Sequence, residues 1–315
     1  MKLGSRQQQF ILITGDSDLT ELLLGLWPAE EVDWTVFERG RGAIERLFNE
    51  PPDLLIVDSA IPDFDAAELV RLVKSENVYR QVPVLICLES EVQEELFDFA
   101  RVEVDDFLLR PVSPVEARAR ITLTVHRAVR ELDANPLTKL PGNTSIINRI
   151  QDLIERGRDF ALLYADLDHF KSFNDKYGFS RGDEVLMMSA RVIVNTIRAF
   201  VGADSFVGHV GGDDFVIILE PDKAEAACQR IVESFDSIVP HFYDPEDRRR
   251  GFISSTDRRG VVREFPFVAI SLGVVFNEGG RLEHYGQASQ IAMNMKKKAK
   301  EVTGSSYALD RRDAP

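Results

Sequence analysis

The chain has little cysteine, no long apolar run and no excess of positive charge, and each shortage excludes a class of protein. Its two cysteines, Cys87 and Cys228, lie far apart in apolar or helical stretches, so we expect reduced thiols and no structural zinc site. No segment approaches the roughly 18 uninterrupted apolar residues of a membrane span. Residues 1–9 are mostly polar, which predicts no signal peptide. We therefore expect a cytoplasmic protein without a membrane partner.

The balance of charge also limits the choice of ligand. The net charge is −14 at pH 7, and an acidic surface repels polyphosphate, so DNA and RNA are not expected as partners. A single nucleotide can still bind, because Mg²⁺ and a local lysine cluster set the field at such a site. The 315 residues, 44% of them hydrophobic, suffice for two folded domains.

The first 112 residues alternate short apolar runs with amphipathic stretches, which predicts a doubly wound (βα)5 domain. The expected parallel strands are Phe10–Thr14, Val32–Phe37, Leu54–Val57, Val84–Leu88 and Asp106–Leu109, with helices in the gaps. Functional residues of such a sheet lie at the carboxyl ends of its strands. Residues 113–134 are expected to form a helical linker, because Pro114 suits an early helix position and Asn135-Pro136 ends the pattern.

Residues 135–315 predict a second α/β domain. The expected strands are Phe160–Ala165, Phe206–Val210, Phe215–Leu219 and Phe267–Phe276, and the expected helices are near Thr144–Arg156, Arg181–Phe200, Lys223–Ile238 and Gln287–Lys300. The segment Tyr243–Glu264 is crowded with Asp, Arg and Gly, and we expect it to be a solvated hairpin or loop insertion.

Two acidic motifs in the second half suggest a divalent-metal site. An apolar strand delivers Asp166 and Asp168 at its carboxyl end, where hard oxygen ligands suit Mg²⁺ bound together with phosphates. Gly211-Gly212 predict a tight hairpin turn, because both glycines tolerate positive φ, and Asp213 follows the turn. Taken singly, a strand-end aspartate is usually a cap and a Gly-Gly turn only a hairpin. If the two strands are neighbours, however, Asp166 and Asp213 share one cation.

The first half resembles response-regulator receiver domains. The segments that carry this resemblance are Pro52–Asp58, Ile61–Asp63, Val82–Val84 and Asp105–Pro111. Asp58 stands at the family's phosphoacceptor position, but most of the other positions that the phosphorylation chemistry needs differ from the family pattern. Thr14-Gly15 replace the family's acidic pair after the first strand, and Asp16 follows one position later. Leu88, preceded by Cys87, replaces the switch Ser or Thr after the fourth strand. Arg110 replaces the family's lysine. The resemblance therefore implies a vestigial phosphoacceptor, in a module that docks, dimerises or senses a ligand and could bind a sensor or effector protein.

The second half resembles GGDEF-type diguanylate cyclases. The matching segments, in the family's order, are Asn135–Asn143, Asp166–Asp175, Gly182–Leu186, Gly211–Phe215 and Ser271–Val274. The resemblance implies condensation of two GTP molecules into cyclic di-GMP with release of pyrophosphate, supported by Mg²⁺ or Mn²⁺. One such domain holds one nucleotide, so a homodimer is implied as well.

The resemblance also implies roles for individual residues. The metal would be held by Asp166, the main-chain carbonyl of Leu167 and Asp213, and the catalytic carboxylates would be Asp213, as base for the 3′-hydroxyl, and Asp214. The implied substrate-binding residues are Asn174 and Asp183 for guanine, Phe170 and Lys171 for the phosphates through main-chain N–H groups, and Lys296 and Lys300 for the terminal phosphate. For Lys296–Lys298, a solvated helix face remains the alternative.

Several positions depart from the family pattern. Asp214 is one methylene shorter than the usual Glu, and a displacement of ~1 Å can cost about 10²-fold in rate. Phe179 replaces a common histidine, and Asn135 replaces an aspartate. Gly202 and Ser205 stand where the family's charged feedback pair stands, so no product feedback site is expected.

Three functions remain open at this point. The retained Asp166, Asn174, Asp183 and Asp213 favour a diguanylate cyclase. Asp214 and Phe179 favour a catalytically impaired domain that binds GTP or a cyclic dinucleotide as a regulator. A purely structural dimeric scaffold would not need the retained set.

Overall fold

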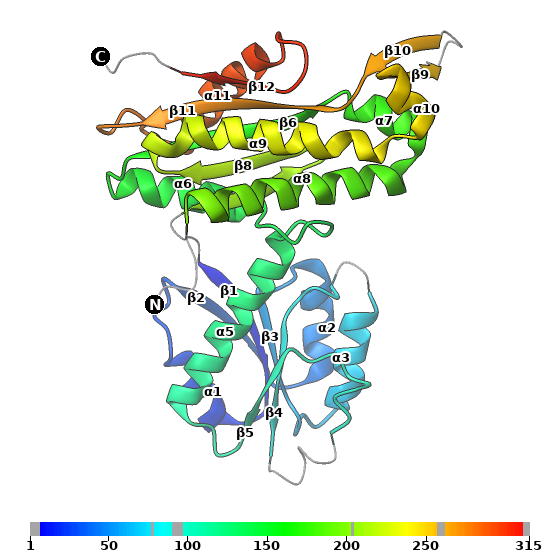
Figure 1. Ribbon diagram of the computed structural model, residues 1–315. Helices are drawn as coiled ribbons and strands as arrows, with labels where there is room; N and C mark the ends of the chain where they lie inside the picture. Colours follow the sequence, from blue (N-terminus) through cyan, green and yellow to red (C-terminus); the bar gives the residue numbers. More distant parts are fainter. Residues whose placement is uncertain (1–6, 77–78, 90–96, 203–204, 257–261, 311–315) are drawn as a thin grey trace. The chain divides into compact units, whose positions relative to one another are not determined.

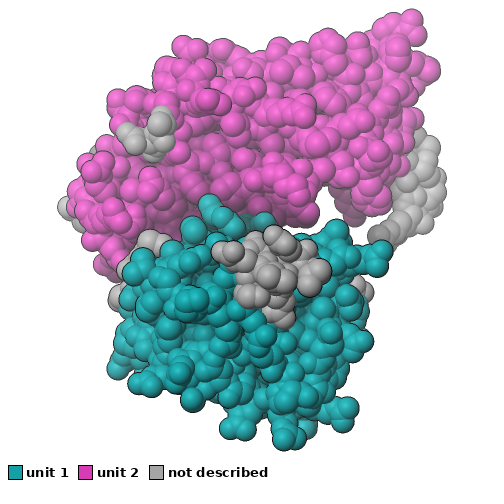
Figure 2. Space-filling model, turned by 90° about the horizontal axis from the view of Figure 1, so that it is seen from below, with its two compact units in different colours: residues 1–132 teal, residues 133–315 magenta. Residues whose placement is uncertain are grey.

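The computed structural model describes residues 7–76, 79–89, 97–202, 205–256 and 262–310. The chain forms two compact units, residues 1–132 and residues 133–315 (Figure 2). Each unit is an α/β structure built on its own five-stranded sheet, which confirms the predicted fold class. No helix among the described residues is long and apolar enough to cross a lipid bilayer.

The first unit is a parallel sheet with helices on both faces. Its strands are β1 (Gln8–Ile13), β2 (Val32–Phe37), β3 (Leu54–Asp58), β4 (Val84–Leu88) and β5 (Asp106–Leu109), in the order β2-β1-β3-β4-β5 (Figure 1). Every residue of β3 and β4 is buried, as expected for central strands covered on both faces. Helices α2 (Gly40–Asn49) and α3 (Ala66–Ser75) pack on one face. The helix expected between Leu88 and Asp106 includes residues 90–96, which lie outside the described residues.

The opposite face of this sheet is covered by α1 (Ser17–Leu24) and by the long helix α5 (Pro114–Asp133). Ala117, Ile121 and Val125 of α5 are almost fully buried against the strands. The amino-terminal part of the predicted linker helix is therefore also part of the core of the first unit. The boundaries at residues 112 and 134 remain a prediction.

The second unit has a mixed sheet in the order β12-β11-β6-β8-β7. Its strands are β6 (Phe160–Asp168), β7 (Phe206–Gly211), β8 (Asp214–Leu219), β11 (Ala269–Asn277) and β12 (Ser306–Leu309). All neighbours in this sheet are antiparallel except β11 and β12. The nine-residue strand β6 lies at the centre and pairs with β8 as far as Asp166, so the sheet places the carboxyl end of β6 next to β8.

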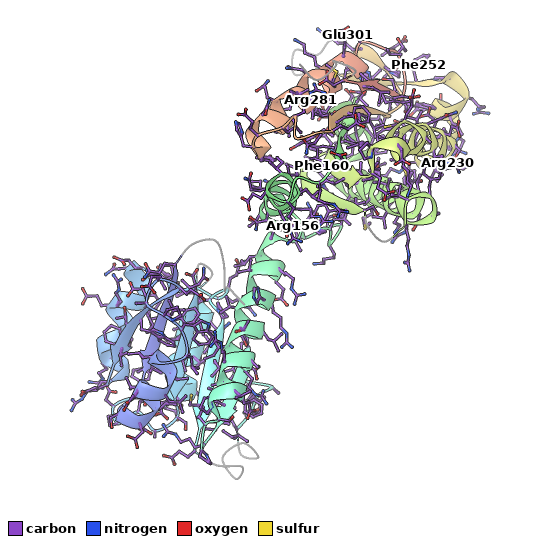
Figure 3. All side chains as sticks on the ribbon, turned by 90° about the vertical axis from the view of Figure 1, so that its left-hand side faces the viewer. Arg156, Phe160, Arg230, Phe252, Arg281 and Glu301 are labelled. Carbon is purple, nitrogen blue, oxygen red and sulfur yellow. The ribbon has the colours of Figure 1, made fainter. Side chains whose placement is uncertain are left out.

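Helices cover both faces of this second sheet (Figure 3). Helices α8 (Phe179–Phe200) and α9 (Ala224–Ile238) enclose the larger core on one face. Helices α6 (Asn143–Glu155) and α11 (Tyr285–Ala299) cover the other face. Gly273 of β11 lets α11 approach closely, because a Cβ there would lie 2.2 Å from the main-chain nitrogen of Lys296. This glycine therefore sets the height of the α11 lysines above the sheet.

The segment Tyr243–Glu264 forms helix α10 (Pro245–Arg250) and the hairpin of β9 (Phe252–Thr256) and β10 (Val262–Pro266), with residues 257–261 outside the described residues. The expected hairpin is present, but the expectation of a solvated segment is wrong for its base. Tyr243 is 2% exposed and stacks on Phe267 with ring centroids 4.0 Å apart. The hydroxyl of Tyr243 also accepts a hydrogen bond from the Val268 N–H at 2.7 Å. Tyr243 thus packs the start of this polar insertion into the core of the second unit.

Candidate active site

Carboxylates from two neighbouring strands meet at one point of the second sheet. Asp166 lies at the carboxyl end of β6, and its register partner on β8 is Asp214. Asp213 lies just before β8, in the turn made by Gly211 and Gly212, whose φ angles are 147° and 57°. One oxygen from each of Asp166, Asp213 and Asp214 lies within 4.8 Å of the others. Within the described ranges, this is where three possible ligand side chains come together.

Lys296 of α11 and Lys300, the residue directly after this helix, pair with carboxylates of this cluster. The Lys296 ammonium lies 3.0 Å from an oxygen of Asp166 and 2.5 Å from an oxygen of Asp214. The Lys300 ammonium pairs with the other oxygen of Asp166. The Lys296 side chain is only 15% exposed, so the alternative of a solvated helix face does not hold for it. Lys296 and Lys300 are one helical turn apart, which places both on the face above β6.

The carboxyl groups respond differently to this environment. Burial opposes ionisation of Asp166, but the ammonium groups of Lys300 and Lys296 outweigh it and lower the pKa of Asp166. For Asp213, burial and then the neighbouring charges of Asp166 and Asp214 raise the pKa. The pKa values of Lys296 and Lys300 are raised, because the carboxylates outweigh the effect of burial. A cation beside Asp213 would relieve the repulsion between the carboxylates, so the donor set fits a hard divalent metal.

The sequence placed Asp168 with Asp166 at the strand end but gave Asp168 no separate role, and it gave none to Ser271, although both contact the residues of this cluster. One oxygen of Asp168 lies 2.9 Å from the Lys300 ammonium, and the other accepts a hydrogen bond from the buried Ser271 hydroxyl. Alternation along β6 could have indicated this position, because residues 166 and 168 point to the same face of a strand. Leu167, between them, buries its side chain in the opposite core and leaves only its main chain for the site.

The proposed guanine-reading residues lie together on two consecutive helices. Asn174 lies on α7 (Phe170–Tyr177), and Asp183 lies exposed near the start of α8. Asn174 contacts Gly182 so closely that a Cβ at position 182 would lie 1.8 Å from the amide oxygen. That oxygen is buried without a hydrogen-bond partner in the described residues, and a buried acceptor is costly unless a donor reaches it. Phe179 begins α8 and is 80% exposed.

The start of α7 follows directly on the carboxyl end of β6. His169 takes a left-handed conformation with a φ of 63°, and its side chain does not cap the helix. The first N–H groups of α7, including those of Phe170 and Lys171, therefore lack a side-chain cap. Unpaired N–H groups at a helix start can bind phosphate oxygens. Strand β10 flanks this turn, since the ring centroid of Phe265 lies 6.3 Å from that of His169.

The two positions of the absent feedback pair lie just before β7. Gly202 has a φ of 94°, and its carbonyl accepts a hydrogen bond from the Ser205 hydroxyl at 2.7 Å. Neither side chain carries a charge. The absence of a product feedback site remains a prediction.

The acidic pocket of the first unit is filled by an arginine. Asp58, at the end of β3, is 1% exposed and accepts hydrogen bonds from the Thr14 hydroxyl at 2.5 Å and from Arg110 at 2.6 Å. The same guanidinium pairs with Asp16, which also caps α1. Burial disfavours charge on Arg110, but Asp16 and Asp58 outweigh it and raise its pKa. One guanidinium therefore occupies the space beside both carboxylates.

Comparison with known families agrees with this division of the chain. Residues 11–122 match the model of the response regulator receiver domain. Residues 132–254 match the model of the diguanylate cyclase GGDEF domain. The two matches follow each other along the chain, in the order predicted from the motifs.

Curated proteins similar to this chain include a response regulator and a diguanylate cyclase. Response regulator PleD of Caulobacter vibrioides is 30% identical over 200 residues, which cover 58% of this chain and 43% of PleD. The bifunctional diguanylate cyclase/cyclic di-GMP phosphodiesterase MucR of Pseudomonas aeruginosa is 35% identical over 133 residues, 38% of this chain and 19% of MucR. This chain thus spans less than half the length of either relative.

Solved structures give weaker matches. The coiled coil and GGDEF domain of DgcB from Caulobacter crescentus, in complex with c-di-GMP, is 20% identical with a TM-score of 0.44, covering 62% of this chain and all of that one. A response regulator structure from Chloroflexus aurantiacus is 20% identical with a TM-score of 0.36, covering 39% of this chain and all of that one.

Proposed function

Because this chain carries a response regulator receiver domain followed by a GGDEF domain, we propose that it is a diguanylate cyclase that condenses two GTP molecules into cyclic di-GMP and releases pyrophosphate. The observation that supports this most directly is the meeting of Asp166, Asp213 and Asp214 beside two lysines. A scaffold protein has no need of three mutually repelling carboxylates at one point.

The carboxylate cluster fits Mg²⁺ or Mn²⁺. Asp166, the Leu167 carbonyl and Asp213 would hold the ion, since hard oxygen donors suit these metals. When bound, the metal offsets charge on the phosphates and lowers the pKa of the attacking hydroxyl.

The triphosphate would lie between the start of α7 and the α11 lysines. Lys296 and Lys300 pair with Asp166. With a metal ion held by the carboxylates, the two ammonium groups would be available to pair with the terminal phosphate. The N–H groups of Phe170 and Lys171 would bind the phosphates from the other side.

The guanine base would be read by Asn174 and Asp183. The amide oxygen of Asn174, buried without a partner, would accept from an N–H of the base, and the exposed Asp183 would accept from another. A site that leaves buried polar groups unpaired without its ligand discriminates strongly against a base that lacks the matching donors.

The reaction requires two such half-sites. Asp213, whose pKa is raised by burial and by Asp166, would take the proton of the 3′-hydroxyl as that oxygen attacks the α-phosphorus of the second GTP. Pyrophosphate leaves, and the same step repeats with the roles exchanged. A homodimer that brings two GGDEF domains face to face supplies this geometry.

The receiver would work without phosphorylation. The Arg110 guanidinium lies where Mg²⁺ and a phosphoryl group would need to approach Asp58, and Thr14 takes up an oxygen of the same carboxylate. This unit would therefore bind a sensor or effector protein or contribute to dimerisation. Acetyl phosphate with Mg²⁺ should leave the intact mass unchanged, and a stable added phosphate lost in Asp58→Asn would contradict this.

Turnover is tested by incubating the purified chain with GTP and Mg²⁺ and measuring cyclic di-GMP and pyrophosphate by chromatography. We expect product from the native chain and none from Asp213→Asn. Asp222→Asn, a matched change at an exposed position outside the site, should retain activity. Asp214 is held by Lys296, which favours a second candidate, a regulator that binds GTP or a cyclic dinucleotide without turnover. Tight GTP binding with no product would support that candidate and reject the enzyme.

A further inference from the structure

His209 is a buried histidine that the proposed reaction does not use. It lies on β7, just before the Gly211-Gly212 turn, and is 2% exposed. Its ring stacks on Phe215 of β8, with centroids 4.3 Å apart and an interplanar angle of 26°. Both ring nitrogens have hydrogen-bond partners, so the side chain does more than fill space.

The two partners come from different parts of the unit. Nε2 lies 3.0 Å from the main-chain carbonyl of Gly212, inside the turn itself. Nδ1 lies 3.0 Å from the hydroxyl of Thr138. A carbonyl can only accept, so Nε2 must carry the proton, and in the neutral ring Nδ1 then accepts from the hydroxyl. The ring therefore connects Thr138 to the peptide that directly precedes Asp213.

The loop that contains Thr138 is itself well fixed. The side-chain oxygen of Asn135 accepts from the N–H groups of Leu137 and Thr138, each at 3.0 Å. The carbonyl of Pro141 accepts from the His209 N–H at 2.8 Å. This loop begins immediately after α5, whose last residue, Asp133, accepts hydrogen bonds from three N–H groups at the start of α6.

We propose that His209 is a positioning residue that fixes the Gly211-Gly212 turn, and with it Asp213, against the loop directly after α5. This inference rests on the proposed function, because it assigns His209 to the metal-binding turn. Gly212 has a φ of 57°, and the Gly212–Asp213 peptide orients the Asp213 side chain. A hydrogen bond to the Gly212 carbonyl limits rotation of that peptide, whereas an unrestrained glycine turn has many conformations.

The test separates the hydrogen bond from the stacking. His209→Phe keeps a ring on Phe215 but loses both nitrogens. His209→Gln loses the ring but can place an N–H donor the same number of bonds from the backbone as Nε2. The Mg²⁺ concentration for half-maximal GTP binding should rise about tenfold in His209→Phe and clearly less in His209→Gln, since a lost hydrogen bond is worth up to roughly a factor of ten. The reverse order would mean that the histidine only packs, and would overturn the proposal.

The hydrogen bond between His209 and Thr138 is tested by two variants of Thr138. Thr138→Val removes the hydroxyl at nearly constant volume, and Thr138→Ser keeps it. We expect the Mg²⁺ concentration for half-maximal GTP binding to rise several-fold in the valine variant and to change little in the serine variant. Equal behaviour of the two would reject the connection through Thr138.

Amide hydrogen exchange over residues 206–219 makes the result independent of the proposed activity. In the protein without nucleotide, exchange in this segment should be faster in His209→Phe than in the native chain and in His209→Gln. If the native chain fails to bind GTP, the proposed function fails, while this exchange comparison still decides the role of His209. Equal exchange in all three proteins would overturn the inference.

Discussion

Replacement of Arg110 by methionine gives the sharpest stability test of the receiver pocket. The guanidinium lies 2.6 Å from Asp58, and the side chains are 23% and 2% exposed. Removing one partner of a buried ion pair costs about 3–5 kcal/mol, because the other charge is left unpaired. Arg110 is partly exposed and the Thr14 hydroxyl remains beside Asp58, so we expect the lower end, about 3 kcal/mol.

The assay follows the first unit alone. Both tryptophans of the chain, Trp27 and Trp34, lie in it, so urea unfolding followed by tryptophan fluorescence reports on that unit. With a urea slope of about 2 kcal/mol/M, a loss of 3 kcal/mol lowers the midpoint by roughly 1.5 M. Arg110→Met combined with Asp58→Asn should recover about half of the loss or more, because the unpaired charge is gone. Arg127→Met, at an exposed position of α5, serves as the control. A shift in Arg110→Met no larger than in this control would refute the reasoning.

Three further predictions concern charge, base recognition and pH. Lys296→Gln removes a cation from the carboxylate cluster and from the proposed phosphate site, so calorimetry should show tighter binding of Mn²⁺ alone but weaker binding of GTP with Mn²⁺; a change of both in one direction contradicts this. Asn174→Leu should reduce the preference for GTP over ATP about tenfold or more in competition binding, because the buried acceptor is lost. The hydrogen bond from Arg110, with main-chain N–H groups, lowers the pKa of Asp16 below its ordinary 3.8. The stabilisation of the folded protein by ionised Asp16 is therefore complete above pH 3.8 and is lost as the pH falls through the lowered pKa. Asp16→Asn should thus make the fall of the urea midpoint below about pH 4 less steep.

The sequence predicts well those features that depend on short segments. The apolar runs identify the central strands, and the strand ends correctly indicate where Asp166 and the Gly-Gly turn come to lie. The structure brings Asp166 and Asp213 within reach of one ion, because β6 and β8 are neighbours, as assumed. Strand β12 was not predicted, because its four half-buried residues show no clear alternation of apolar and polar side chains.

What the sequence does not indicate are contacts between segments far apart in the chain. Arg110 pairs with Asp58 and Asp16 across 52 and 94 residues, and no local pattern indicates that one guanidinium reaches both. The hydrogen bond between His209 and Thr138, 71 residues apart, likewise depends on how β7 packs beside the loop after α5. Gly273 shows the same limit, since its small size matters only because α11 crosses above it.

The central claim is that Asp166 and Asp213 hold one divalent cation beside the triphosphate of GTP. The most direct test is anomalous diffraction from crystals of the full chain grown with Mn²⁺ and a non-hydrolysable GTP analogue. The account predicts an anomalous peak within coordination distance of both carboxylates and of a phosphate oxygen, absent in Asp213→Asn. A nucleotide bound with the metal elsewhere, or with Lys296 still paired to Asp166 and no metal between the aspartates, would contradict it.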